Sequence, residues 1–181
     1  VMLKWLGESN RDDIVNTAIA VSPPFDLASS ADHLNTGFSK IYQHNIVNAM
    51  KKKYRQKFVG QCSRLSDKVL NTLTSFRDFD DLITGPIHGF DSAEEYYNKC
   101  SCRQYLKKNQ ITTLILHSKD DPFLPVSAIP EAHELGSDTT MELSNNGGHI
   151  GFISQAKNGR LGYWLESRIL SYLDDFNRHL I

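Results

Sequence analysis

The residues of this chain that could do chemistry are two adjacent acids, Asp120 and Asp121, and one histidine, His149. The acids follow an apolar run, Ile111 to His117, whose β-branched and aliphatic residues predict a strand buried in a parallel sheet. Open α/β sheets place their chemistry just beyond the carboxyl ends of such strands. A histidine that is oriented by an acid can take the proton of a nucleophile, so these residues are candidates for an Asp–His pair.

The setting of His149 supports this hypothesis. It follows Gly147 and Gly148, which permit a tight turn, and this turn comes after a short apolar strand candidate at residues 141–143. Asp121 and His149 are 28 positions apart (149 − 121 = 28), which leaves room for the short helix expected at residues 126–135 and for that strand. Taken alone, the acid could cap a turn and the histidine could be a hydrogen-bonded loop residue.

Length and composition are those of an ordinary soluble globular domain. The chain has 181 residues, 40% of them hydrophobic and 23% charged, with a net charge of -1. The near-neutral balance gives no argument for a nucleic-acid partner. A basic run, residues 51–57, is interpreted as a solvated helix face, with contact to an anionic surface as the alternative. No apolar run is long enough to predict a transmembrane segment.

The cysteines argue against a disulfide framework and against a metal site. Cys62, Cys100 and Cys102 are few and unevenly spaced, and a zinc site usually needs four ligands. A reducing compartment is the simpler interpretation, so we expect a cytoplasmic protein. The sequence contains no Gly-rich phosphate loop. We expect no cofactor.

A second buried strand is predicted at residues 17–22, ended by Pro23 and Pro24. The connection from there to residue 110 is far longer than one crossover helix, so residues 23–110 are predicted to be a mostly helical lid insertion. The core would then comprise residues 1–22 and 111–181. The expected helices are residues 2–6 with Gly7 as the stop, 28–34, 37–58 with an apolar face, 66–73, 92–98 with a capping box, and 161–180.

This order of elements resembles the YheT-like esterase family of the α/β-hydrolase superfamily. The matching segments extend over most of the chain: Ser22 to Asp26, Gly37 to Tyr42, Phe79 to Thr84, Ile87 to Gly89, Tyr96–Tyr97, Leu116 to Phe123 and Gly147 to Phe152. The resemblance implies the C-terminal portion of an α/β-hydrolase fold, with parallel strands flanked by helices and a helical lid insertion. It also implies a Ser–Asp–His triad.

Residue by residue, the resemblance makes Asp121 the acid, because it precedes Pro-Phe-Leu-Pro, with Asp120 as the alternate, and it makes His149 the base. No Gly-x-Ser-x-Gly is present. The chain order Ser, acid, His then places the nucleophile upstream of Val1, in an N-terminal remainder that would be a partner of this segment. One oxyanion-hole donor is expected there too, and residues 1–181 alone are expected to be inactive.

The implied activity is carboxylic-ester hydrolysis (EC 3.1.1.-), with a small-molecule ester or a lipid-like substrate. Phe25, Phe38 and Tyr42 are the candidates for contact with the acyl chain. A different class stays open, namely a non-catalytic α/β-hydrolase relative that has lost its serine and serves as a binding or scaffold protein.

Overall fold

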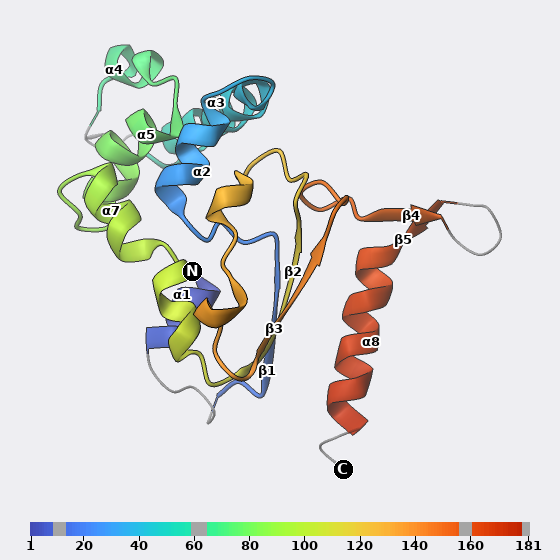
Figure 1. The fold of residues 1–181 in the computed structure, drawn as a ribbon. Helices are drawn as coiled ribbons and strands as arrows, with labels where there is room; N and C mark the ends of the chain where they lie inside the picture. Colours follow the sequence, from blue (N-terminus) through green and yellow to red (C-terminus); the bar gives the residue numbers. More distant parts are fainter. Residues whose placement is uncertain (9–13, 59–64, 156–160, 179–181) are drawn as a thin grey trace. The chain divides into compact units, whose positions relative to one another are not determined.

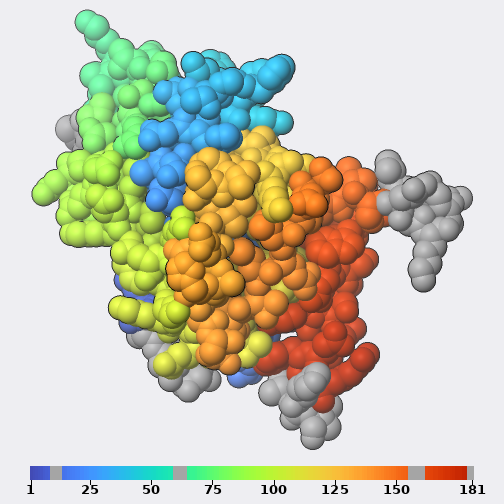
Figure 2. Space-filling view, viewed as in Figure 1, coloured from blue at the N-terminus to red at the C-terminus, as the bar shows by residue number. Residues whose placement is uncertain are grey.

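The computed structural model describes residues 1–8, 14–58, 65–155 and 161–178. The chain divides into two compact units, one made of residues 1–25 with 102–181 and the other of residues 26–101. Figure 1 shows the elements of each unit, and Figure 2 shows the atoms that fill them, with residues 26–101 in light blue to green. Cys62, considered above as a thiol, lies outside the described residues.

The first unit is built on a parallel sheet, as the sequence predicts. Its strands are β1 (Thr17–Val21), β2 (Thr112–Ser118) and β3 (Thr139–Ser144), in the order β1-β2-β3. Ile115 of the central strand pairs with Ala20 on one side and Met141 on the other. The central strand is buried from Thr113 onward, which explains why its sequence is apolar on both faces.

One face of the sheet packs against two short helices. These are α1 (Met2–Glu8) and the 3-10 helix η2 (Arg103–Lys108). Leu3 and Leu106 from these helices join Ala20 and Ile115 in one buried cluster. Alternate side chains of a strand point to the same face, so this cluster fixes which face of each strand points toward α1.

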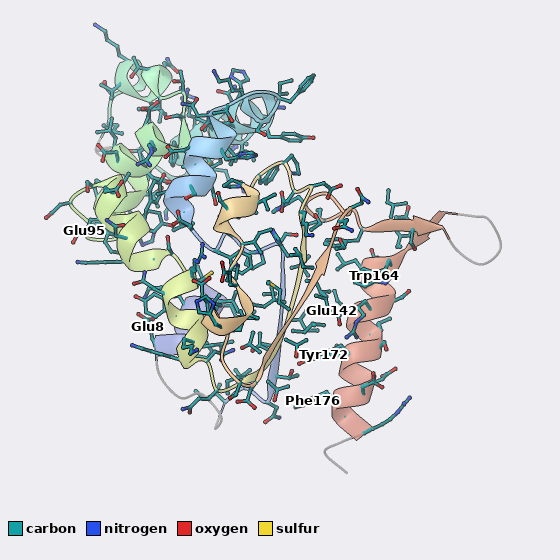
Figure 3. All side chains as sticks on the ribbon, viewed as in Figure 1. Glu8, Glu95, Glu142, Trp164, Tyr172 and Phe176 are labelled. Carbon is teal, nitrogen blue, oxygen red and sulfur yellow. The ribbon has the colours of Figure 1, made fainter. Side chains whose placement is uncertain are left out.

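The long helix α8 (Trp164–Arg178) covers the opposite face, as Figure 1 shows. The hydroxyls of Tyr172 and Thr17 are 2.9 Å apart, and the Arg168 guanidinium binds the Glu142 carboxylate of β3. Figure 3 labels Glu142 beside α8, together with Trp164, Tyr172 and Phe176 along the helix. Helices on both faces of a parallel sheet are the layer arrangement of α/β folds.

Gly7 does not stop the first helix, contrary to the prediction. It lies inside α1 and is buried, and a Cβ there would come within 2.2 Å of the Tyr105 carbonyl oxygen of η2. Glycine is therefore required for the close approach of α1 to η2 and not for ending α1.

The second unit is helical. It contains α2 (Leu27–Leu34), α3 (Ser39–Lys57), α4 (Asp67–Thr72), α5 (Phe76–Phe79), the π-helix η1 (Asp80–Thr84), α6 (Gly85–Ile87) and α7 (Ala93–Cys100). The Ser92 hydroxyl accepts from the Glu95 N–H as the predicted cap. The Glu95 carboxylate accepts from the Asp91 N–H, so the reciprocal bond of a capping box does not form at Ser92.

The apolar face predicted for α3 is wrong in its first turns. Phe38, Ile41 and Tyr42 are 87%, 56% and 46% exposed, whereas Gln43 and Val47 are buried. Gln43 tolerates burial because its amide is hydrogen-bonded: Nε2 donates to Asn35 Oδ1 at 3.1 Å, and Oε1 accepts from the Phe76 N–H at 3.1 Å.

Two other elements differ from the prediction. Residues 126–135 form two short 3-10 turns, η3 (Val126–Ala128) and η4 (Ala132–Glu134), because Pro130 between them has no N–H to continue a helix. The C-terminal helix begins at Trp164, since Leu161–Tyr163 is strand β5, which pairs antiparallel with β4 (Ile153–Gln155). Residues 179–180, expected in that helix, lie outside the described residues.

Candidate active site

The carboxyl ends of β1, β2 and β3 meet at one edge of the sheet. Backbone hydrogen bonds extend the pairing there: the Ser22 N–H donates to the Leu116 carbonyl at 2.8 Å, and the Lys119 N–H donates to the Ser144 carbonyl at 2.9 Å. Residues that follow three different strands are thus brought together, as expected for parallel strands.

Asp121 and His149 form a hydrogen-bonded pair at this edge. His149 Nδ1 lies 2.8 Å from Asp121 Oδ2, and the other carboxylate oxygen accepts from the Phe123 N–H at 2.8 Å. The Asp121 side chain is completely buried, whereas 31% of the His149 side chain is exposed. With Nδ1 donating to the carboxylate, Nε2 of His149 carries the lone pair that could accept a proton.

Asp120 has a different task, which is to hold the Gly147–Gly148 turn. Its Oδ1 accepts from the Gly148 N–H at 2.8 Å and from the Gly147 N–H at 2.9 Å. The hydrogen bond from Gly148 is the main reason that the pKa of Asp120 lies below its ordinary value.

The two glycines are needed for this turn. Gly148 has φ +61°, and a Cβ on Gly147 would lie 2.7 Å from the Phe152 ring. The turn that carries His149 is therefore fixed by one carboxylate and by close packing, while the neighbouring carboxylate orients the imidazole ring.

Two hydroxyl groups that sequence reasoning missed donate hydrogen bonds to backbone carbonyls of the same loop. Ser22 donates to the His149 carbonyl, and Ser118 donates to the Gly148 carbonyl at 2.6 Å. Ser22 is 2% exposed and has φ 44°, an uncommon backbone conformation for a residue other than glycine. Their only signal in the sequence is a small hydroxyl residue at the end of each strand.

Phe123 packs against the imidazole. The ring centroids of Phe123 and His149 are 4.3 Å apart, with an interplanar angle of 32°. This contact restricts rotation of the His149 ring from the side, while Asp121 restricts it in the ring plane. The sequence contains Phe123 in the motif that follows the acids but does not indicate its contact with His149.

His117 is a buried neighbour that sequence reasoning did not select. Its ring is fully buried, and within the described residues neither ring nitrogen has a hydrogen-bond partner. Burial is the main cause that lowers the pKa of His117; the Asp121 carboxylate opposes it, and a positive charge on His149 would act in the same direction as burial. The lowered pKa keeps the His117 imidazole neutral near pH 7.

The three candidates for acyl contact lie in different surroundings. Phe25 is completely buried and packs edge-on against His117, with ring centroids 5.4 Å apart. A fully buried ring has no surface to offer a substrate, so Phe25 supports the core behind the site. Phe38 and Tyr42 are exposed residues of the second unit, at the start of α3.

Within the described ranges, no three His, Cys, Asp or Glu side chains are arranged to bind a metal ion. None of the helices in that part of the chain is long and apolar enough to cross a membrane. Burial raises the pKa of the Cys102 thiol to about 11.

Comparison with known proteins places the chain among hydrolase sequences. "Putative esterase YheT" of Escherichia coli (strain K12) is 36% identical over 176 residues, which are 94% of this chain and 51% of that protein. The chain belongs to the YheT-like α/β-hydrolase family. No family model matches it, and no solved structure matches it.

Two further relatives of this YheT-like chain carry hydrolase names. "Monoacylglycerol lipase" of Saccharomyces cerevisiae is 29% identical over 174 residues, 90% of this chain and 38% of that protein. "Phospholipase ABHD3" of Mus musculus is 32% identical over 179 residues, 96% of this chain and 41% of that protein. The chain thus spans about half, or less, of the length of these curated relatives.

Proposed function

We propose that residues 1–181 supply the acid and the base of a serine hydrolase that cleaves carboxylic esters. The observation that carries the proposal is the hydrogen bond between buried Asp121 and partly exposed His149. The names of the esterase, lipase and phospholipase relatives support the same reaction class. The nucleophilic serine would come from a segment that precedes these residues in a longer protein.

The chemistry explains why each residue type is needed. A serine hydroxyl is a weak nucleophile until a base takes its proton, and His149 Nε2 would take it as Oγ attacks the ester carbonyl carbon. The imidazolium formed is stabilised by Asp121, which stays ionised. His149 would then donate the proton to the leaving alkoxide oxygen, so the ester C–O bond breaks and an acyl-enzyme remains for water to hydrolyse.

The substrate class belongs to the same proposal. We infer a small-molecule ester or a lipid-like ester as the substrate, with the helical residues 23–110 as a lid insertion. Phe38 and Tyr42 support this assignment because they expose aromatic surface in the insertion without contributing to its buried core.

The test uses a longer protein that contains residues 1–181 and the preceding segment. The protein is incubated with a fluorophosphonate, which reacts with activated serines, and is then assayed on a short p-nitrophenyl ester. We expect one phosphonylated serine, stoichiometric loss of ester turnover, and no labelling in a His149→Ala variant. Ester turnover that survives complete labelling, or the absence of both labelling and turnover, would contradict the proposal.

A further inference from the structure

Positive charge is concentrated in one part of the second unit. Between Asp32 and Asp67 the sequence contains seven basic residues and no acid: Lys40, Lys51, Lys52, Lys53, Arg55, Lys57 and Arg64. The net charge of the whole chain is only -1, so the charges are segregated along the sequence. Five of these basic residues lie in the second half of α3. Such a concentration attracts anions.

A pocket of about 480 Å³ lies beside this basic part of α3. Its polar lining consists of His44, Asn48, Lys51, Arg55, Asn71 and Thr74. Two of these side chains are cationic, the others can donate hydrogen bonds, and no carboxylate is among the lining residues. We call it the α3–α4 pocket, because Asn71 is in α4 and four of the other residues are in α3.

Lys51 is the unusual member of this set. It is only 8% exposed, and within the described residues its Nζ has one hydrogen-bond partner, the Asn71 carbonyl at 3.4 Å. No carboxylate of the described residues lies within ion-pair distance of it. Residues 59–64, whose placement is not described, contain no acid. Burying an ammonium group without a counter-ion is unfavourable, so a bound anion would stabilise Lys51 at this position.

Arg55 is already arranged for such a ligand. Its Nε donates to Asp67 at 2.8 Å and its Nη2 donates to Asn71 Oδ1 at 2.6 Å, which holds the guanidinium at the pocket wall. The Asp67 carboxylate offsets part of the Arg55 charge, but its side chain is 77% exposed and weakly desolvated. Lys51 and Arg55 are four residues apart and therefore lie on the same side of α3.

We propose that the α3–α4 pocket binds a phosphate group, either from a soluble phosphate ester or from a phospholipid headgroup. Lys51 would supply the buried charge, and His44, Asn48 and Thr74 would supply further hydrogen bonds to phosphate oxygens. Phosphate fits better than a carboxylate because it has more oxygens to accept from the several donors that line the pocket. This proposal is independent of the ester chemistry at Asp121 and His149.

The first experiment measures inorganic phosphate and glycerol 3-phosphate binding by calorimetry, in a protein that contains residues 1–181, with chloride at equal ionic strength as the reference. The test variant is Lys51→Met, which keeps the aliphatic stem. The matched control is Lys53→Met, which removes the same charge from the same helix about 200° further around its axis. We expect Lys51→Met to weaken binding at least ten-fold, roughly the effect of one charged hydrogen bond, and Lys53→Met to change it less than two-fold.

Thermal unfolding separates this role from a structural one. Phosphate should raise the Tm of the parent protein and of Lys53→Met but not that of Lys51→Met, while without phosphate Lys51→Met should melt no lower than the parent. Should Lys51→Met fail to fold, Arg55→Gln removes a second lining charge, and its phosphate affinity gives the same test. Absence of phosphate binding in the parent, or equal loss in Lys51→Met and Lys53→Met, would overturn the proposal.

A vesicle arm distinguishes the two sources. Sedimentation with vesicles that contain phosphatidylglycerol is compared with sedimentation with phosphatidylcholine alone. Loss of binding in Lys51→Met but not in Lys53→Met identifies a lipid headgroup as the ligand. Vesicle binding that is the same in both variants, together with phosphate binding that depends on Lys51, identifies a soluble phosphate ester.

Discussion

Replacing Asp121 by Asn separates the orienting role of this acid from the packing role of its side chain. The Phe123 N–H can only donate, so it keeps the oxygen of the new amide, where it now donates to Asp121 Oδ1 at 2.8 Å. The amide nitrogen then faces His149 Nδ1, where the carboxylate oxygen now lies 2.8 Å away. Two donors cannot face each other, so the imidazole must place its proton on Nε2. That tautomer cannot take the serine proton.

The expected loss of activity is large because the substitution changes the tautomer of His149, and does not only remove one hydrogen bond. In a serine protease, replacing the acid of the catalytic triad by Asn lowers kcat by about 10,000-fold, which corresponds to an activation barrier higher by about 5 kcal/mol. The assay is kcat/KM on a short p-nitrophenyl ester, in a protein that contains residues 1–181 and the proposed serine, with the Tm as a folding control. We expect a loss of that order for Asp121→Asn with little change in Tm.

Asp120→Asn is the matched control for this prediction. An Asn at this position keeps an oxygen that can accept from the Gly147 and Gly148 N–H groups, so the turn persists and the loss should be less than about ten-fold. The reasoning is refuted if Asp120→Asn abolishes turnover while Asp121→Asn spares it. In that case the acid assignment is wrong by one residue.

Three further outcomes are expected. Because burial lowers the pKa of His117 in the folded state, the unfolded chain takes up a proton near pH 6.5 before the folded chain does, so the free energy of unfolding falls as the pH drops below that value. Denaturant titrations from pH 7.5 to 5 should show this fall, and His117→Leu should reduce it; an unchanged slope would contradict the assignment. Phe38→Ala and Tyr42→Ala should shift chain-length preference, with turnover of a very short ester nearly unchanged, and uniform loss on all esters would contradict the acyl role. Residues 1–181 expressed alone should aggregate or melt without cooperativity, because within the described residues β1 (Thr17–Val21) pairs on one edge only; a soluble monomer with a sharp melt would refute this.

The sheet and the acid–histidine pair could be predicted from the sequence because their signals are local. β2 is an apolar run of strand length followed at once by two acids, and β3 leads within a few residues to Gly147, Gly148 and His149. Parallel pairing then brings the strand ends together without further information. The resemblance already favoured Asp121 over Asp120, because Pro-Phe-Leu-Pro follows Asp121, and the structure adds what each carboxylate contacts.

The parts that could not be predicted depend on contacts between distant residues. The Ser22 hydroxyl holds the His149 backbone from 127 positions away. Gln43 is buried in α3 because of an amide network with Asn35 and Phe76, and hydropathy counts it as a surface residue. The three-residue strand β5 is too short to show a period of two, so the sequence pattern predicts that its residues begin the C-terminal helix.

The most direct test of the proposed acid–base pair is the ester kcat/KM of His149→Ala, measured beside His133→Ala in the same longer protein. His133 is an exposed histidine outside the site, so it controls for the loss of an imidazole as such. We predict that His149→Ala loses at least about 10,000-fold and that His133→Ala stays within about two-fold of the parent protein. Near-normal turnover by a folded His149→Ala protein would contradict the proposed role of His149.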